Sequence, residues 1–142
     1  MIPRYYGDVD TSLGTGSVFD LIMDQNGTVS KSLAYYLSSN KETEKYGDSL
    51  FKSLHLLKDY LLQNRIIAMD IKHYNILCQK AESGIFRSFL IDNIYNSELI
   101  PISTYSPYFA KHKILRKWQR FEEKLLNIFK DNKTLRRMMK PD

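Results

Sequence analysis

The segment AMDIKHYNIL, residues 68–77, is the part of this sequence that most strongly indicates a fold. It contains Asp70, a lysine two residues later (Lys72) and an asparagine five residues later (Asn75). Kinase-like phosphotransferases use this spacing in their catalytic loop, where the aspartate accepts the proton of the substrate hydroxyl. The following apolar run ends at Asp92, where such enzymes hold Mg²⁺. The pattern predicts Asp70 and Lys72 as catalytic residues and Asn75 and Asp92 as metal ligands.

Each of these residues also has an ordinary structural interpretation. Asp and Asn side chains bond to nearby backbone groups and are therefore common in loops. Lys72 is equally compatible with a solvated side chain, and Asp92 with a turn. The spacing alone does not separate the two interpretations. The predicted order of helix, loop, strand, turn and strand around the motif favours the phosphotransferase.

The hydrophobic pattern predicts an α+β fold that is mainly α. Leucines recur every three or four residues from Leu50 to Leu61, which indicates a buried helix over Leu50–Gln63 after a polar loop, Ser38–Gly47. A second helix is expected from Pro107 to about residue 130, with Ile114, Trp118, Phe121, Leu125 and Ile128 at core spacing. Residues 94–107 are expected to be irregular. Short strands are predicted at residues 2–6, 17–23, 76–78 and 88–91, with a turn at 14–16.

Composition sets the class of protein. The chain has 142 residues, of which 43% are hydrophobic and 13% aromatic, enough for one domain or one lobe of a larger domain. The single cysteine, Cys78, excludes an internal disulfide, and its apolar surroundings predict a buried thiol. The sequence contains no zinc-binding spacing, signal pattern or membrane-spanning run. We therefore expect a cytoplasmic protein.

The net charge of +5 is concentrated near the C-terminus. Eleven lysines and arginines lie between Lys111 and Lys140, against three acidic residues. This stretch predicts weak anion binding through Lys113, Arg116, Lys117 and Arg120. The alternative is a solvated helix face. Nucleic acid is a less favoured partner, because Trp118 and Phe121 have core spacing and do not form a stacking platform.

Several uncommon strings occur in an order that resembles one known family. They are IPRYYG (2–7), GTGSVFD (14–20), LKDYL (57–61), NRII (64–67), KHYNILC (72–78) and DNI (92–94). From Ile2 to about Phe121 the chain resembles the YrbL family of bacterial PhoP regulatory network proteins, which has a protein-kinase-like pattern. The resemblance implies one kinase-like domain, with strands in residues 1–25 leading to a hinge and a helical lobe in residues 26–142. It also implies ATP and Mg²⁺ as cofactors, with adenine at Met23 and Asp24, and a role in the response to low Mg²⁺.

The chain also departs from the kinase pattern. A Gly-rich phosphate loop and its partner lysine would precede Ile2 and are absent. Ala68 and Met69 replace the usual His and Arg before the catalytic aspartate, and Asp92 is followed by Asn-Ile rather than Phe-Gly. We therefore expect an inactive isolated chain, either a fragment or a naturally short protein. The open sheet edge predicts self-association or a partner that supplies the missing lobe. The alternative function is a non-catalytic, pseudokinase-type regulatory module.

Overall fold

A computed structural model describes residues 1–92 and 106–139, so the segment expected to be irregular lies almost entirely outside the described residues. The elements are β1 (Tyr5–Thr11), β2 (Gly14–Phe19), β3 (Lys31–Ser32), α1 (Leu33–Leu37), α2 (Asn40–Gln63), the short helix η1 (His73–Asn75), β4 (Ile76–Lys80), β5 (Phe86–Leu90), α4 (Pro107–Ile128) and α5 (Lys133–Met139). The described residues thus combine helices with short antiparallel strands, and more of them are helical. No helix among them has the length and apolar character that a membrane span requires.

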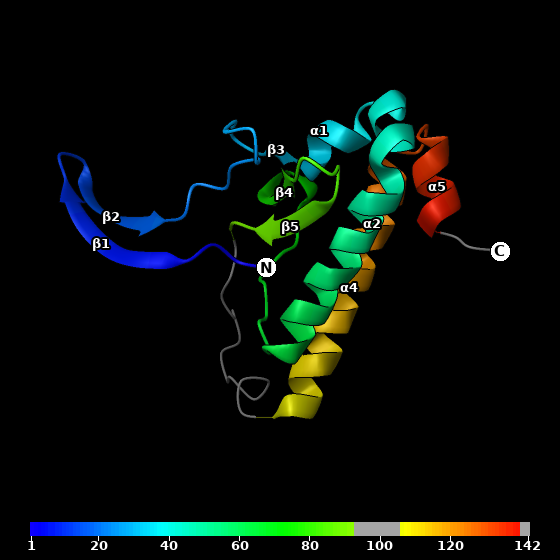
Figure 1. Cartoon of the computed structure of the whole chain (residues 1–142). Helices are drawn as coiled ribbons and strands as arrows, with labels where there is room; N and C mark the ends of the chain where they lie inside the picture. The colour runs from blue at the N-terminus through cyan, green and yellow to red at the C-terminus, as the bar shows by residue number, and fades with distance from the viewer. Residues whose placement is uncertain (93–105, 140–142) are drawn as a thin grey trace.

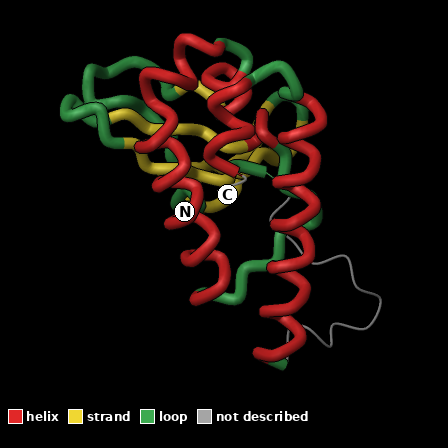
Figure 2. The backbone as a smooth tube through the Cα atoms, turned by 90° about the vertical axis from the view of Figure 1, so that its right-hand side faces the viewer, coloured by secondary structure: helices red, strands yellow, loops and turns green. Residues whose placement is uncertain are grey.

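The body of the molecule consists of long helices packed beside a small sheet. The sheet has the order β3-β4-β5 and is antiparallel throughout. Helix α2 packs against β5, and α4 runs antiparallel beside α2 (Figures 1 and 2). Apolar side chains from the helices and the sheet form a shared core, which includes Leu33, Leu57, Ile76, Leu90 and Trp118.

Helix α2 confirms the predicted scaffold helix and corrects where it begins. Its leucines from Leu50 to Leu61 at helical spacing are buried, as the periodicity predicts. The prediction of a polar loop before this helix is wrong, because residues 40–47 form the first two turns of α2. The Ser39 hydroxyl caps the helix by accepting a hydrogen bond from the Glu42 backbone N–H at 3.2 Å. Two small residues in this polar stretch, Thr43 and Gly47, are buried, so an apolar pattern could not reveal that it is helical.

The C-terminal helices largely match the sequence pattern. Pro107 occupies the first turn of α4, and the predicted core residues Ile114, Trp118, Phe121 and Leu125 are buried. Ile128 was predicted at core spacing but is exposed, because it lies at the helix end. The following tail forms α5. The Asn132 side chain is buried and joins α5 to the body by donating to the Leu37 carbonyl at 2.9 Å and the Thr43 hydroxyl at 2.8 Å.

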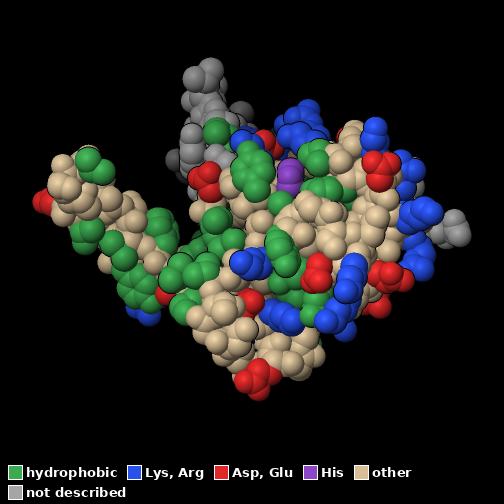
Figure 3. Space-filling model, turned by 90° about the horizontal axis from the view of Figure 1, so that it is seen from above, with side chains coloured by type: hydrophobic (Ala, Val, Ile, Leu, Met, Phe, Trp, Pro, Cys, Tyr) green, Lys and Arg blue, Asp and Glu red, His purple; other side chains and the backbone are tan. Residues whose placement is uncertain are grey.

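Strands β1 and β2 form a hairpin that projects from the body (Figure 1). The prediction of a turn at Gly14–Gly16 is wrong. Thr11 pairs with Gly14, so the turn between the strands falls at residues 12–13. Gly14 begins β2 with a φ of +114°, a conformation that favours glycine. The hairpin carries exposed apolar side chains along its length (Figure 3). These are Tyr5, Tyr6, Val9, Leu13, Val18 and Phe19.

Candidate functional site

The candidate catalytic loop connects α2 to β4 and is anchored by apolar side chains. Ile67, Ala68 and Ile71 are buried in the core. Asp70 and Lys72, on either side of Ile71, are only partly buried. The loop therefore has a fixed backbone and presents two charged side chains at the surface.

Asn75 and Asp92 meet because the backbone brings their segments together. The backbone N–H of Ile91 donates to the Asn75 carbonyl at 3.0 Å, at the point where β5 ends. The Asn75 side-chain amide then donates to a carboxylate oxygen of Asp92 at 3.1 Å. Asn75 is buried and Asp92 is exposed, so one member of the pair is held in the core and the other reaches solvent. The two residues predicted as metal ligands thus lie side by side.

Lys72 links this pair electrostatically to Asp70. A hydrogen bond to Tyr74 raises the pKa of Lys72, and the nearby carboxylates of Asp70 and Asp92 raise it further. Its ammonium group lies 5.6 Å from the centre of the Tyr74 ring. Lys72 therefore remains protonated at neutral pH and balances negative charge between the two carboxylates.

The donor set at Asn75 and Asp92 fits Mg²⁺. This ion prefers hard oxygen ligands, retains several waters and commonly takes only one or two carboxylates from the protein, with substrate phosphates supplying the rest. One amide and one carboxylate in contact are consistent with that chemistry. Within residues 1–92 and 106–139, no group of three or more His, Cys, Asp or Glu side chains forms an all-protein metal cage.

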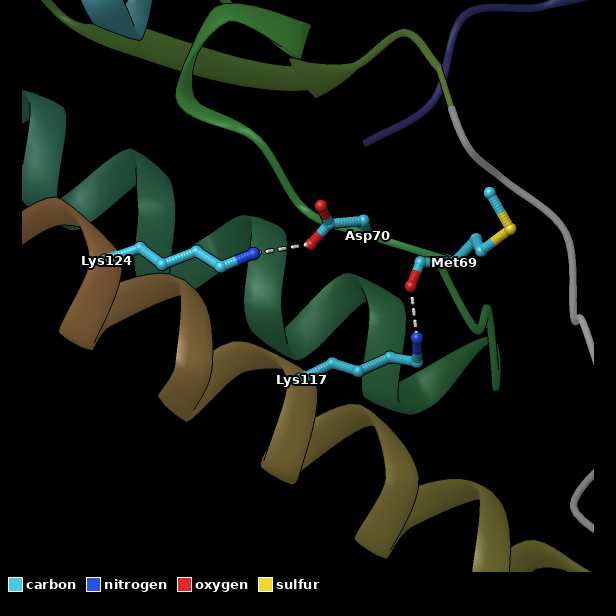
Figure 4. A network of polar contacts seen from close by, with 4 residues as sticks. All are labelled: Met69, Asp70, Lys117 and Lys124. Carbon is cyan, nitrogen blue, oxygen red and sulfur yellow. Dashed lines mark hydrogen bonds and ion pairs between the residues drawn. The ribbon is translucent and has the colours of Figure 1, made fainter.

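Helix α4 contacts the candidate loop through two lysines (Figure 4). The Lys124 ammonium lies 3.2 Å from a carboxylate oxygen of Asp70, and Lys117 donates a hydrogen bond to the carbonyl oxygen of Met69. Burial lowers the pKa of Lys117, and the neighbouring cation of Lys113 lowers it further. Positive charge from α4 thus lies next to the position predicted for the catalytic base.

The predicted anion-binding residues are only partly brought together with the catalytic loop. Lys117 contacts it directly, and Lys113 and Arg120 lie on the same side of α4, since positions three, four and seven apart share a helix face. Arg116 is exposed, and although it lies three residues from Lys113 and four from Arg120, it directly precedes Lys117 and is therefore turned further from the candidate loop around the helix. Lys124 is not among the residues predicted from the sequence. Its spacing of seven from Lys117 places it on the same face two turns later, and this was the signal that could have found it.

The predicted hinge residues are engaged within the chain. The Met23 carbonyl accepts a hydrogen bond from the Gln79 side chain at 2.8 Å. The Asp24 carboxylate accepts hydrogen bonds from the Ser30 hydroxyl at 2.6 Å and the Lys80 backbone N–H at 2.9 Å. These contacts give Asp24 a structural role, in which it joins the segment predicted as the hinge to the end of β4. Adenine binding at Met23 and Asp24 stays a prediction.

A cavity of about 500 Å³ lies near the hinge, beside β5 and α2. Met23, Gln79, Leu56 and Phe86 are among its lining residues. The described residues that line it do not include Asp70, Asn75 or Asp92. The cavity therefore does not connect the hinge to the Asn75–Asp92 pair.

Comparisons with known proteins place the chain in a family. The sequence profile described as PhoP regulatory network protein YrbL matches residues 1–126. The chain is 39% identical over 120 residues to a protein of Escherichia coli (strain K12) named "Uncharacterized protein YrbL", and to the protein of the same name in Shigella flexneri. This chain belongs to the family of PhoP regulatory network proteins YrbL.

The match covers 84% of this chain but 57% of each of the two relatives. The chain thus spans little more than half the length of the curated relatives it matches. No solved structure matches the chain significantly.

Proposed function

We propose that this chain carries the catalytic lobe of a Mg²⁺-dependent, kinase-like phosphotransferase, and that the nucleotide site is completed by a further segment or a partner. The observation that carries the proposal is the contact between Asn75 and Asp92 at 3.1 Å, with Lys72 near enough to Asp70 and Asp92 for both carboxylates to raise its pKa. Spacing in the sequence gave these residues as candidates, and their proximity in space supports a common site.

Each residue has a defined task in the proposed reaction. The acceptor hydroxyl forms a bond to the terminal phosphorus of ATP, the bond from that phosphorus to the bridging oxygen breaks, and ADP leaves. Asp70 accepts the proton of the hydroxyl, and Lys72 balances the negative charge on the transferred group. Asn75 and Asp92 would hold Mg²⁺, which neutralises the phosphates when it is bound.

Titration with ATP tests the proposal. We would record ¹H–¹⁵N NMR spectra of the chain with ATP in the presence and absence of Mg²⁺. Because the chain is proposed to provide only part of the nucleotide site, we expect it to bind ATP weakly. Mg²⁺-dependent shifts are expected for the amides of residues 70–77. Asp92→Ala should abolish these shifts, whereas Asp10→Ala, a matched change on the exposed hairpin, should leave them intact. The proposal fails if no Mg²⁺-dependent shifts appear, and micromolar affinity would overturn the idea that the site is incomplete.

A non-catalytic regulatory module is the second candidate. Two observations favour it: the Met23 carbonyl is already bonded to Gln79, and the Asp70 carboxylate is already paired with Lys124. This alternative predicts that Asp70→Ala and Asp92→Ala leave the cellular function of the protein intact. Loss of function in both folded variants would exclude it.

A further inference from the structure

Four cationic side chains form a row along one face of α4, here termed the α4 cationic face: Lys113, Lys117, Arg120 and Lys124. Their spacings of four, three and four residues place them on consecutive turns of the same face. The buried core residues, such as Trp118 and Leu125, occupy the adjacent face. The row therefore lies at the border between the core and the surface, next to the catalytic loop.

The α4 cationic face is crowded with like charges. Residues of the same sign three or four apart on a helix repel one another. Lys117 is the most constrained member, because it is partly buried, bonds to the Met69 carbonyl and lies near the charges of Lys113 and Arg120. The Asp70 carboxylate compensates part of this positive charge by forming an ion pair with Lys124. Lys117, Arg120 and Lys124 together outnumber this one carboxylate, and an anionic ligand would neutralise the excess positive charge.

We propose that the α4 cationic face binds an anionic group, a phosphate in the first instance, on the acceptor substrate. The inference rests on the proposed function and names the class of acceptor. Arg120 is exposed and offers a planar fork of donors that suits a phosphate. Lys124 reaches both this surface and Asp70, so an acceptor held by the face presents its hydroxyl group close to the proposed base.

The position of the face separates it from the nucleotide phosphates. The proposed Mg²⁺ ligands, Asn75 and Asp92, come from the strand side of the loop, where the charges of both Asp92 and Asp70 act on Lys72. The α4 cationic face approaches Asp70 from the helix side, through Lys124 (Figure 4). Asp70 is thus approached by Lys72 from within the loop and by the α4 cationic face from the helix. Lys72, with the proposed metal ligands, suits the transferred phosphoryl group, and the α4 cationic face suits an anion on the molecule that receives it.

Inorganic phosphate is the probe for this site. We would titrate the chain with phosphate at constant ionic strength, adjusted with chloride, and follow ¹H–¹⁵N NMR shifts. Saturable shifts are expected at the amides of Met69 and Asp70 and along residues 116–124. Arg120→Gln should weaken phosphate binding about fivefold, in line with the loss of one exposed charge contact. Lys111→Gln is the matched control, because Lys111 is an exposed cation outside this row, and it should leave the affinity unchanged.

Three outcomes would overturn the inference. Shifts that do not saturate, or that are equal in both variants, would show a general ionic effect. Loss of phosphate binding in the presence of bound Mg-ATP would assign the face to nucleotide phosphates instead of the acceptor. If Mg-ATP does not bind at all, the proposed function fails, and with it the assignment of the face to the acceptor substrate. Phosphate-induced shifts that depend on Arg120 would in that case still establish an anion site.

Discussion

The helical body and the β1–β2 hairpin differ in how they are stabilised. Core residues of the body such as Leu50 and Leu61 have 0% of their surface exposed, whereas Leu13 at the hairpin tip is 99% exposed and Phe19 is 53% exposed. The hairpin is held by contacts within itself, such as the pair of rings at Tyr5 and Phe19, 5.2 Å apart. The body thus carries its own core, whereas the hairpin presents apolar surface that suits a partner.

The largest expected effect separates the two regions by a matched pair of leucines. Leu61→Ala should lower the free energy of unfolding by about 2 to 5 kcal/mol, because it leaves a cavity in a fully buried site. Leu13→Ala should change it by less than about 0.5 kcal/mol. Chemical denaturation monitored by circular dichroism measures both. Equal losses in the two variants would mean that the hairpin packs against the body in solution.

The hairpin itself is predicted to mediate self-association or binding to a partner. Replacing an apolar aromatic residue buried in such a contact should cost about 1.5 to 3 kcal/mol of association energy. Phe19→Ser should therefore shift the protein towards monomer in sedimentation experiments, and Ile128→Ser, an exposed apolar residue of α4, is the control. A wild-type protein that stays monomeric at high concentration would remove the prediction of self-association.

A buried polar contact supplies the next test of the body. Asn132→Ala removes the side chain that donates to the Leu37 carbonyl and the Thr43 hydroxyl and that accepts from the Leu135 N–H. Leaving buried polar groups without partners should lower the free energy of unfolding by about 1 to 3 kcal/mol. The exposed Asn127, changed to Ala, should have little effect. If the two asparagine variants unfold alike, α5 is not joined to the body as described.

The contribution of His73 to the dependence of stability on pH is a smaller effect. Burial lowers the pKa of His73, whose ring packs against Phe129 with the ring centres 5.3 Å apart. The unfolded chain therefore binds a proton more readily than the folded chain, and stability should fall as the pH drops below about 6.5, by at most about 1.4 kcal/mol per pH unit. His73→Phe should flatten this part of the profile of unfolding free energy against pH, and the exposed His55→Gln should not. An unchanged profile in His73→Phe would contradict the assignment.

The sequence predicted the features that depend on apolar periodicity. Leu50 to Leu61 and Ile114 to Leu125 have helical spacing, and the structure buries them. The spacing of the candidate catalytic loop also selected Asn75 and Asp92, which are in contact because the turn between β4 and β5 returns Asp92 to Asn75. A local sequence pattern is sufficient to predict which residues lie close together when a single helix, or two consecutive strands, determines their positions.

Features that depend on contacts between distant segments could not be predicted in this way. Thr43, in the polar first turns of α2, is buried and accepts a hydrogen bond from Asn132, which lies far along the chain. Strand β3 has two residues and is recognisable only from its pairing with β4. The helical spacing of Lys124 assigns it to the face of Lys117, but only the structure shows that it lies 3.2 Å from Asp70. In each case the partner lies too far along the chain for a local pattern to identify it.

The central claim is that Asn75 and Asp92 hold a divalent ion beside Asp70, and paramagnetic Mn²⁺ tests it most directly. Mn²⁺ with ATP broadens the NMR signals of nearby amides even when a small fraction of the protein is bound. We predict selective broadening in residues 70–77 and at Asp92, and its loss in Asp92→Ala but not in Asp10→Ala. Broadening that is absent from this loop, or that persists in Asp92→Ala, would contradict the metal site and the phosphotransferase built on it.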